Sequence, residues 1–217
     1  MSISDTIFLL QSAQSEPSPS VIVSALYKAL SLASSDPSTR AELRDGGACR
    51  LVASILHFNL SSSSVIASSL KLISKLLLSD EGQQFSVAES IDIFSSVDGC
   101  KDIHSILRKH GDKKEILYWC LTVLCLVCIN DSKRTRFGSI GTVDAVLENL
   151  SDHIDAPEIS EAGLRALHRL ITDHKQNKER ARASGGFDII IRIIRKQLDM
   201  KEVAELGFLI LNCLSCG

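Results

Sequence analysis

Four segments of the sequence carry the same spacing of apolar residues behind a small or turn-forming residue. The leading residues are Gly46, Asp98, Gly141 and Gly185, so successive segments begin 52, 43 and 44 residues apart. Apolar side chains follow all four leading residues at offsets of +2, +5 and +9, three of them also at +6 and two at +8, and these offsets return to one face of a helix. A period of this length is typical of a chain built from stacked units rather than from one globule.

Each of these segments is followed by a polar break and then by a longer apolar helix. The long helices are expected at residues 20–33, 65–78, 114–129, 158–172 and 201–214. An Asp follows each of the first four, at Asp36, Asp80, Asp131 and Asp173, before a short polar helix. No stretch alternates apolar and polar residues as a half-buried strand does, so the fold class is all-α.

A three-helix unit of about 42 residues, with Gly between its first and second helices, resembles the armadillo repeat over nearly the whole chain. The two-helix HEAT repeat is the nearest alternative, and the glycine turns favour the armadillo repeat. The resemblance implies a right-handed α-solenoid of about four to five repeats, forming a single domain over residues 1–217. We expect a partial N-terminal repeat at 1–36 and repeats at about 37–80, 81–131, 132–173 and 174–217.

Two segments depart from the regular repeat. Residues 81–97 are longer than the matching segments, which indicates either a loop insertion or an elongated first helix; Phe85, Ile91, Ile93 and Phe94 favour the helix. The last helix, within ELGFLILNCLSCG, is apolar almost all round. A helix of that kind is normally buried, so either a further chain or subunit covers it, or it forms a well-wrapped cap.

Composition excludes several classes of protein. With 45% hydrophobic residues and a net charge of -2, the chain is neither disordered nor surrounded by a strong field for nucleic acid or membrane. The longest apolar run, residues 116–129, is shorter than the roughly 20 residues that a membrane span needs. The N-terminal sequence lacks a basic secretory region, and seven Cys without dense spacing favour reduced thiols. We expect a cytoplasmic protein, with the nucleus as an alternative, and no membrane partner.

Candidate chemical motifs are weak. The pairs Cys125/Cys128 and Cys213/Cys216 have the spacing of a zinc ligand pair, but both fall on long apolar helices, so we interpret them as packing residues. The six His residues show no metal-ligand spacing, and the chain has no phosphate-binding glycine motif. The sequence therefore predicts no metal, no cofactor and no catalytic residues, and the chain is not expected to be an enzyme.

The resemblance implies that the third helix of each repeat lines a concave groove that holds an extended partner. Polar residues stand out on these apolar helices, and we take them as candidate groove residues: Tyr27, Lys28, Lys71, Lys75, Trp119, Thr122, Arg165, His168, Arg169 and Asn212. Lys71 and Lys75 are four residues apart, as are Arg165 and Arg169, so each pair shares one helical face. A row of such residues favours an acidic segment, although it could equally be the solvated stripe of amphipathic helices.

We therefore predict a protein-interaction scaffold or adaptor that binds a partner segment, extended or helical, in this groove. One alternative is an Hsp70-type co-chaperone that exchanges nucleotide. Another is a nuclear transport adaptor, but the ladder of Trp and Asn that such adaptors carry is missing, because only Trp119 and Asn212 stand at comparable places. Nucleic-acid binding fits less well, because the basic segments 132–136 and 175–182 lack aromatic stacking partners.

Overall fold

The computed structural model describes residues 2–79 and 84–216, and this part of the chain contains fourteen helices and no strand. The all-α prediction is therefore confirmed. The residues group into two compact units, a first unit that ends at Asp102 and a second unit that begins at Ile103. The predicted repeat at residues 81–131 is divided between these two units.

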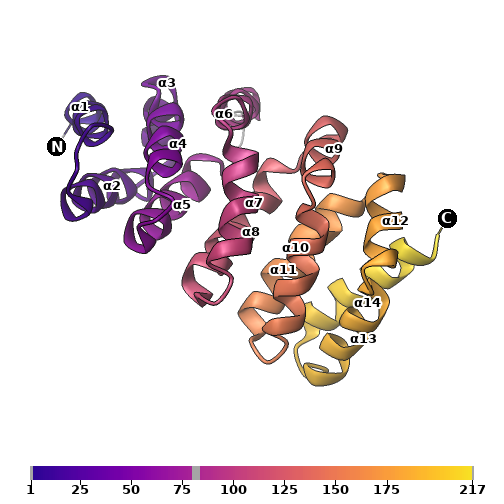
Figure 1. Ribbon diagram of the computed structural model, residues 1–217. Coiled ribbons are helices and arrows are strands. Elements are labelled where there is room, and N and C mark those ends of the chain that lie inside the picture. The colour runs from indigo at the N-terminus through magenta and orange to yellow at the C-terminus, as the bar shows by residue number, and fades with distance from the viewer. Residues whose placement is uncertain (1, 80–83, 217) are drawn as a thin grey trace. The chain divides into compact units, whose positions relative to one another are not determined.

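The first unit holds the partial repeat and the first complete repeat (Figure 1). Its helices are α1 (Ile3–Ala13), α2 (Pro19–Ala33), α3 (Pro37–Asp45), α4 (Ala48–Phe58), α5 (Ser63–Leu76), α6 (Gln84–Ser96) and the start of α7 (Gly99–Lys109). The two third helices of this unit, α2 and α5, pack directly against each other.

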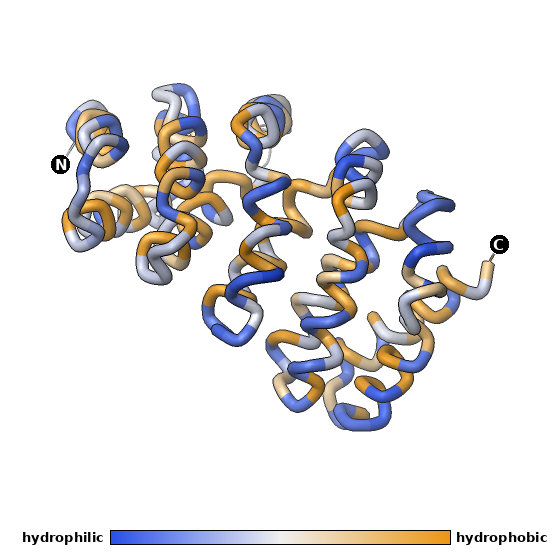
Figure 2. The backbone as a smooth tube through the Cα atoms, viewed as in Figure 1, coloured by the Kyte–Doolittle hydropathy of each residue, from blue (hydrophilic) through white to orange (hydrophobic). Residues whose placement is uncertain are grey.

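The second unit repeats the same three-helix arrangement (Figure 1). After the rest of α7 come α8 (Lys114–Val127), α9 (Asp131–Ser139), α10 (Thr142–Asp152), α11 (Pro157–Ile171), α12 (Lys175–Ala183), α13 (Gly186–Lys196) and α14 (Lys201–Ser215). The third helices of this unit form a row in which α8 packs on α11 and α11 packs on α14. Figure 2 shows the short helix α12 in hydrophilic colours, as expected for a first helix at the surface.

The five third helices are the elements that the sequence predicts most accurately. Each of α2, α5, α8, α11 and α14 begins and ends within two residues of the predicted long segment. Two of them begin with a proline, Pro19 or Pro157, at the first helical position, where the missing backbone donor has no intrahelical partner to lose.

The turns between first and second helices have a left-handed residue, as the glycine pattern predicts. Gly47, Gly141 and Gly185 have φ of 84°, 84° and 74°, and Asp98 takes the same conformation with φ of 62°. Within the doublet Gly46-Gly47 the left-handed residue is the second one, because Gly46 has φ of -72°. Its N–H still donates to the Glu42 carbonyl at 2.9 Å, so α3 is not yet complete there and the reversal falls on Gly47.

The long segment before Asp98 is an elongated first helix. Helix α6 has 13 residues, whereas α3, α9 and α12 each have 9. Ile91 and Phe94 are buried, as predicted, whereas Ile93 is half-exposed. The expected helix start at Asp80 and the side chain of Phe85 lie outside the described residues.

Candidate partner-binding face of the third helices

The third helices can be compared position by position because each follows an N-cap residue with extended backbone. These N-caps are Ser18, Ser62, Lys113, Ala156 and Met200. The ninth residue after each N-cap is, in order, Tyr27, Lys71, Thr122, Arg165 and Leu209. Four of the candidate groove residues therefore lie at one equivalent position, and the fifth helix has an apolar residue there.

Other candidates fall near this position on the same side of their helices. Lys75 and Arg169 are the thirteenth residues after their N-caps, one turn beyond the ninth, and His168 and Asn212 are the twelfth. Trp119 is the sixth residue of α8. We call the surface formed by these positions the third-helix face.

Lys28 lies on a different side of its helix. It is the tenth residue after the N-cap, a position that Leu72, Val123, Ala166 and Ile210 fill with fully buried side chains in the other third helices. Lys28 is exposed and lines a cavity of about 260 Å³ together with residues of α1. Helical spacing therefore turns Lys28 away from the ninth position, and the packing of α1 on α2 adds the cavity beside it.

In the first unit the third-helix face is basic. Tyr27 is exposed, whereas Lys71 and Lys75 are half-buried, so their aliphatic stems lie against the helix surface. The sequences of α2 and α5 include no Asp or Glu. The third helices of this unit therefore contribute two lysines and no acidic residue to the third-helix face.

In the second unit the third-helix face contains a cavity of about 280 Å³ between α8 and α11. Thr122 and Arg165, two of the predicted residues, line it together. Its other lining residues are Tyr118, Cys125, Leu126, Glu158, Glu161 and Ala162. The prediction missed Tyr118, although its place one turn before Thr122 on the same helix could have identified it.

The charge of this cavity differs from the predicted row of Lys and Arg. Arg165 donates to Glu161 Oε1 from Nε at 3.0 Å and from Nη2 at 2.9 Å, within the same helix. Glu158 also lines the cavity, so α11 brings carboxylates as well as a guanidinium. The exposed Arg169 lies one turn further along α11.

Two other candidates have restricted roles. Burial, and then the charge of Arg169, hold the pKa of His168 below its ordinary value, so its ring is neutral at neutral pH. Trp119 is half-buried and packs edge-on against Tyr118, with ring centroids 5.0 Å apart and an interplanar angle of 83°. Asn212 is exposed on α14.

The two cysteine pairs lie on or just beyond two different helices, Cys125/Cys128 at the end of α8 and Cys213/Cys216 at the end of α14. No group of three or more His, Cys, Asp or Glu side chains gathers as a metal site within residues 2–79 and 84–216. Cys128 is buried, as predicted for a packing residue, whereas Cys125 lines the cavity between α8 and α11. The packing interpretation was wrong for Cys216, which is exposed because it lies just beyond the end of α14. None of the described helices has the length and apolar character to cross a bilayer.

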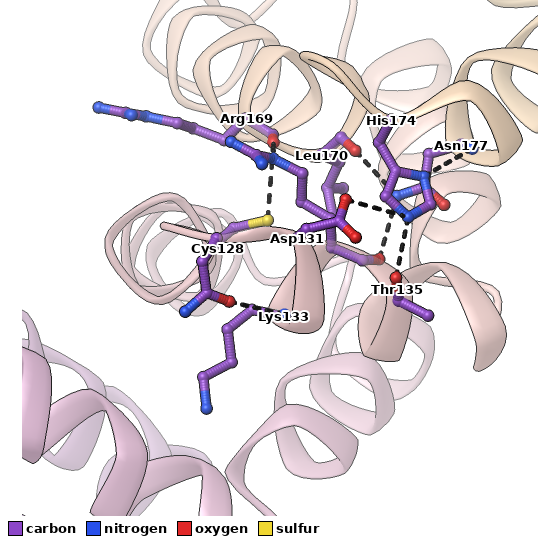
Figure 3. Close-up of polar contacts among 10 residues, drawn as sticks. Cys128, Asp131, Lys133, Thr135, Arg169, Leu170, His174 and Asn177 are labelled. Carbon is purple, nitrogen blue, oxygen red and sulfur yellow. Dashed lines mark hydrogen bonds and ion pairs between the residues drawn. The ribbon is translucent and has the colours of Figure 1, made fainter.

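A polar cluster that the sequence did not predict links α9, α11 and α12 (Figure 3). Asn177 donates from Nδ2 to the Leu170 carbonyl at 2.8 Å, and His174 Nε2 lies 3.0 Å from Thr135 Oγ1. Cys128 Sγ donates to the Arg169 carbonyl at 3.7 Å. The cluster satisfies carbonyl groups at the C-terminal end of α11, so we assign it to repeat stacking rather than to ligand binding.

Comparison of the chain with protein-family models finds no match, and comparison with curated proteins finds none either. Solved structures do resemble it. A designed armadillo repeat protein in complex with the peptide (KR)4 superposes with a TM-score of 0.76 at 15% identity, covering 98% of this chain and 81% of that one. Computationally designed armadillo repeat proteins for modular peptide recognition give 0.78 at 15% identity, covering 97% and 81%.

A structure that concerns a phosphorylation switch in the interaction between cadherin and beta-catenin gives a TM-score of 0.62 at 18% identity, covering 99% of this chain and 47% of that one. The helix order, the left-handed turns and these superpositions agree with one another. The chain has the armadillo-repeat fold.

Proposed function

We propose that this chain is a non-enzymatic protein-interaction module that binds an extended partner segment on its third-helix face. The observation that carries the proposal is the recurrence of outward side chains at the ninth and thirteenth positions of helices that are otherwise apolar. Such side chains add nothing to the core, so a repeat can vary them for recognition without loss of stacking. The neighbour bound to (KR)4 is an example of this fold holding a peptide.

The partner segment that suits the first unit is acidic. Lys71 and Lys75 are half-buried and lie one turn apart, with the exposed ring of Tyr27 at the position of α2 equivalent to Lys71. Partial burial limits the screening of these charges by solvent and salt, so carboxylates of a partner gain more here than at a fully exposed site. The second unit offers an apolar-floored cavity with mixed charge, which suits one larger side chain of the partner.

The test uses two labelled peptides, (DE)4 and (KR)4, and fluorescence anisotropy. We expect the wild-type chain to prefer (DE)4, and added salt to weaken that binding. Even an exposed ion pair contributes about 0.2–1 kcal/mol, and the double reversal Lys71→Glu with Lys75→Glu replaces two attractive pairs by two repulsive ones, so it should weaken (DE)4 binding about tenfold or more.

The matched control is Arg50→Glu, a charge reversal on α4 in the same unit, where the side chain is exposed but is not part of a third helix. It should leave (DE)4 binding within twofold of the wild type. Equal loss in the control and in the double variant would show a non-specific charge effect. Unchanged binding in the double variant would reject the third-helix face as the acidic-peptide site.

A further inference from the structure

Two positions of the third helices are buried wherever a neighbouring third helix packs against them. The first is the eighth residue after the N-cap. Leu26, Leu121 and Leu164 occupy it in α2, α8 and α11, each of which is followed in its own unit by another third helix, and each is 0% exposed. Phe208 occupies the same position in α14 and is 59% exposed.

The second position is the third residue after the N-cap. Val65, Ile159 and Val203 occupy it in α5, α11 and α14, each of which is preceded in its own unit by a third helix, and they are at most 1% exposed. Val21 occupies the same position in α2 and is 50% exposed. When two third helices stack, the side of the earlier helix that carries its eighth residue therefore packs against the side of the later helix that carries its third residue.

In the part of the chain that the structure describes, both halves of this interface are uncovered, one on α14 and the other on α2. The α2 half is hollowed by the cavity of about 260 Å³ between α1 and α2, in which apolar residues, Leu9, Ala13, Val21 and Ala25, alternate with three serines, Glu16 and Lys28. The α14 half projects Phe208. Burying a phenylalanine stabilises an apolar contact by about 1.5–3 kcal/mol, and exposed apolar patches of this kind mark interaction surfaces.

We propose that the α14 face of one copy docks on the α1–α2 face of a second copy and continues the stacking of third helices between molecules. The contact is heterologous, because each copy uses a different surface, so further copies can add in the same way. The surface borders the third-helix face, because Phe208 lies one turn before Asn212 on α14, and it extends from there toward the side where a neighbouring repeat would pack.

A symmetrical pairing of two α14 faces would place two projecting Phe208 rings against each other, whereas the proposed pairing offers Phe208 the cavity between α1 and α2. Lys28, at the tenth position of α2, is the feature that weakens the proposed contact, because a buried apolar residue fills this position in the other third helices. Its long aliphatic stem can cover apolar surface while the ammonium stays in water, so we expect reversible association.

The experiment uses a complementary pair of variants of the full chain, studied by analytical ultracentrifugation. Val21→Asp blocks the α2 half and leaves α14 intact, whereas Phe208→Asp blocks α14 and leaves α2 intact. Each variant alone should associate about 30-fold or more weakly than the wild type, as expected for a central apolar anchor. An equimolar mixture should form a 1:1 dimer and nothing larger, because only one productive pair of surfaces remains.

Two further variants keep the test decisive. Phe58→Asp alters a phenylalanine that is 74% exposed on α4 and does not line the cavity between α1 and α2, and this variant should associate like the wild type. Lys28→Leu places the residue type of Leu72 at the same position of α2 and should strengthen association by tenfold or more. Circular dichroism checks that each variant is folded.

Three results would overturn the proposal. One is a wild-type chain and a Lys28→Leu variant that both stay monomeric at the highest soluble concentration, which would assign the α14 face to a different occupant. Another is a mixture of the two Asp variants that stays monomeric. The third is that Phe208→Asp abolishes association whereas Val21→Asp and Lys28→Leu leave it unchanged. That result would indicate a symmetrical contact between two α14 helices.

Discussion

His174 uses both ring nitrogens to join two repeats. It is the N-cap of α12, and its Nδ1 accepts the backbone N–H of Asn177 at 3.2 Å. Because Nδ1 is an acceptor, the proton of the neutral ring is on Nε2, which can donate to Thr135 Oγ1 of α9 at 3.0 Å. The residue is 7% exposed, so neither nitrogen could readily exchange its partner for water. One side chain thus caps a helix and ties it to the preceding repeat.

Replacing this residue tests both roles. His174→Ala removes the cap and the link to Thr135, and we expect it to lower the free energy of unfolding by about 1–2 kcal/mol, the usual value for a lost N-cap. His174→Asn keeps a capping oxygen and should recover most of the loss that comes from the cap. Urea denaturation measures both variants. A loss below about 0.5 kcal/mol for His174→Ala would contradict the capping role.

Asp102, in the first unit, is a buried carboxyl whose pKa should be changed by its surroundings. Its side chain is 5% exposed and contacts His57 Nδ1 at 3.1 Å. Burial raises the pKa of this carboxyl above its ordinary value, and the hydrogen bond and charge of His57 oppose that shift. Because the pKa is higher in the folded than in the unfolded chain, ionisation of Asp102 opposes folding, and this penalty disappears as the pH falls through the folded-state pKa.

The measurement is the carboxyl carbon shift of Asp102 against pH by nuclear magnetic resonance. Asp102 should titrate above an ordinary aspartate, and His57→Ala should raise its pKa further because the opposing interaction is lost. Asp36 is a control of opposite sign in the same unit. Hydrogen bonds from Ser38 and Thr39 hold the pKa of its carboxyl below the usual range. Titration of both residues at the ordinary value would contradict the proposed environments.

At the scale of elements, the sequence predicted the helices because their determinants are local. An apolar helix of fifteen residues such as α11, or a left-handed turn at Gly185, is determined by nearby residues.

The candidate site was predicted less well because it depends on which helices pack beside one another. The tenth position of Lys28 already turns it away from the third-helix face, but only the packing of α1 on α2 places a cavity beside it, and Arg165 is paired with Glu161. The pairing could have been anticipated from their i, i+4 spacing, whereas the cavity beside them could not, because α8 supplies its other wall.

Two glycines in the third helices allow close packing between helices, a role that the spacing of apolar residues in the sequence does not reveal. Gly163 is the seventh residue of α11, and a Cβ there would lie 2.6 Å from Leu150 Cδ2 of α10. Gly207 is the seventh residue of α14, and its Cβ would lie 2.6 Å from Ile194 Cγ1 of α13. The absence of a side chain at this position lets the second helix of each repeat approach the third closely.

A pair of Ala substitutions separates this packing role from the role of glycine in a turn. Gly163→Ala should lower the free energy of unfolding by about 1–3 kcal/mol through overpacking, despite the better helix propensity of Ala. Gly185→Ala has open space around the new Cβ, so only its φ of 74° opposes the change, at about 1–2 kcal/mol.

Leu150→Ala distinguishes the two mechanisms in double variants, followed by urea denaturation. It makes room beside Gly163 and should reduce the additional loss caused by Gly163→Ala. The loss caused by Gly185→Ala should be unchanged in the same background. Simple additivity of Gly163→Ala and Leu150→Ala would contradict the overpacking explanation.

At the scale of the whole molecule, the sequence reads as one regular array, whereas the contacts group the chain into two units that meet within α7. In repeat proteins each repeat is stabilised mainly by its immediate neighbours, so a local loss of packing need not spread along the chain. The first unit is joined through α2 and α5, and the second through α8, α11 and α14. We therefore expect the two units to respond separately to destabilisation.

Two equivalent core substitutions test this expectation by hydrogen exchange. Leu26 and Leu164 are both the eighth residue of a third helix and both 0% exposed, one in each unit. Either Leu→Ala change should lower local stability by about 2–5 kcal/mol through the cavity it leaves. Leu164→Ala should speed amide exchange in α8, α11 and α14 and leave α2 and α5 near wild-type rates, and Leu26→Ala should do the reverse. Acceleration spread equally over both units by either variant would show that the chain unfolds as one cooperative body, because the loss of one stacking contact would then be shared by every repeat.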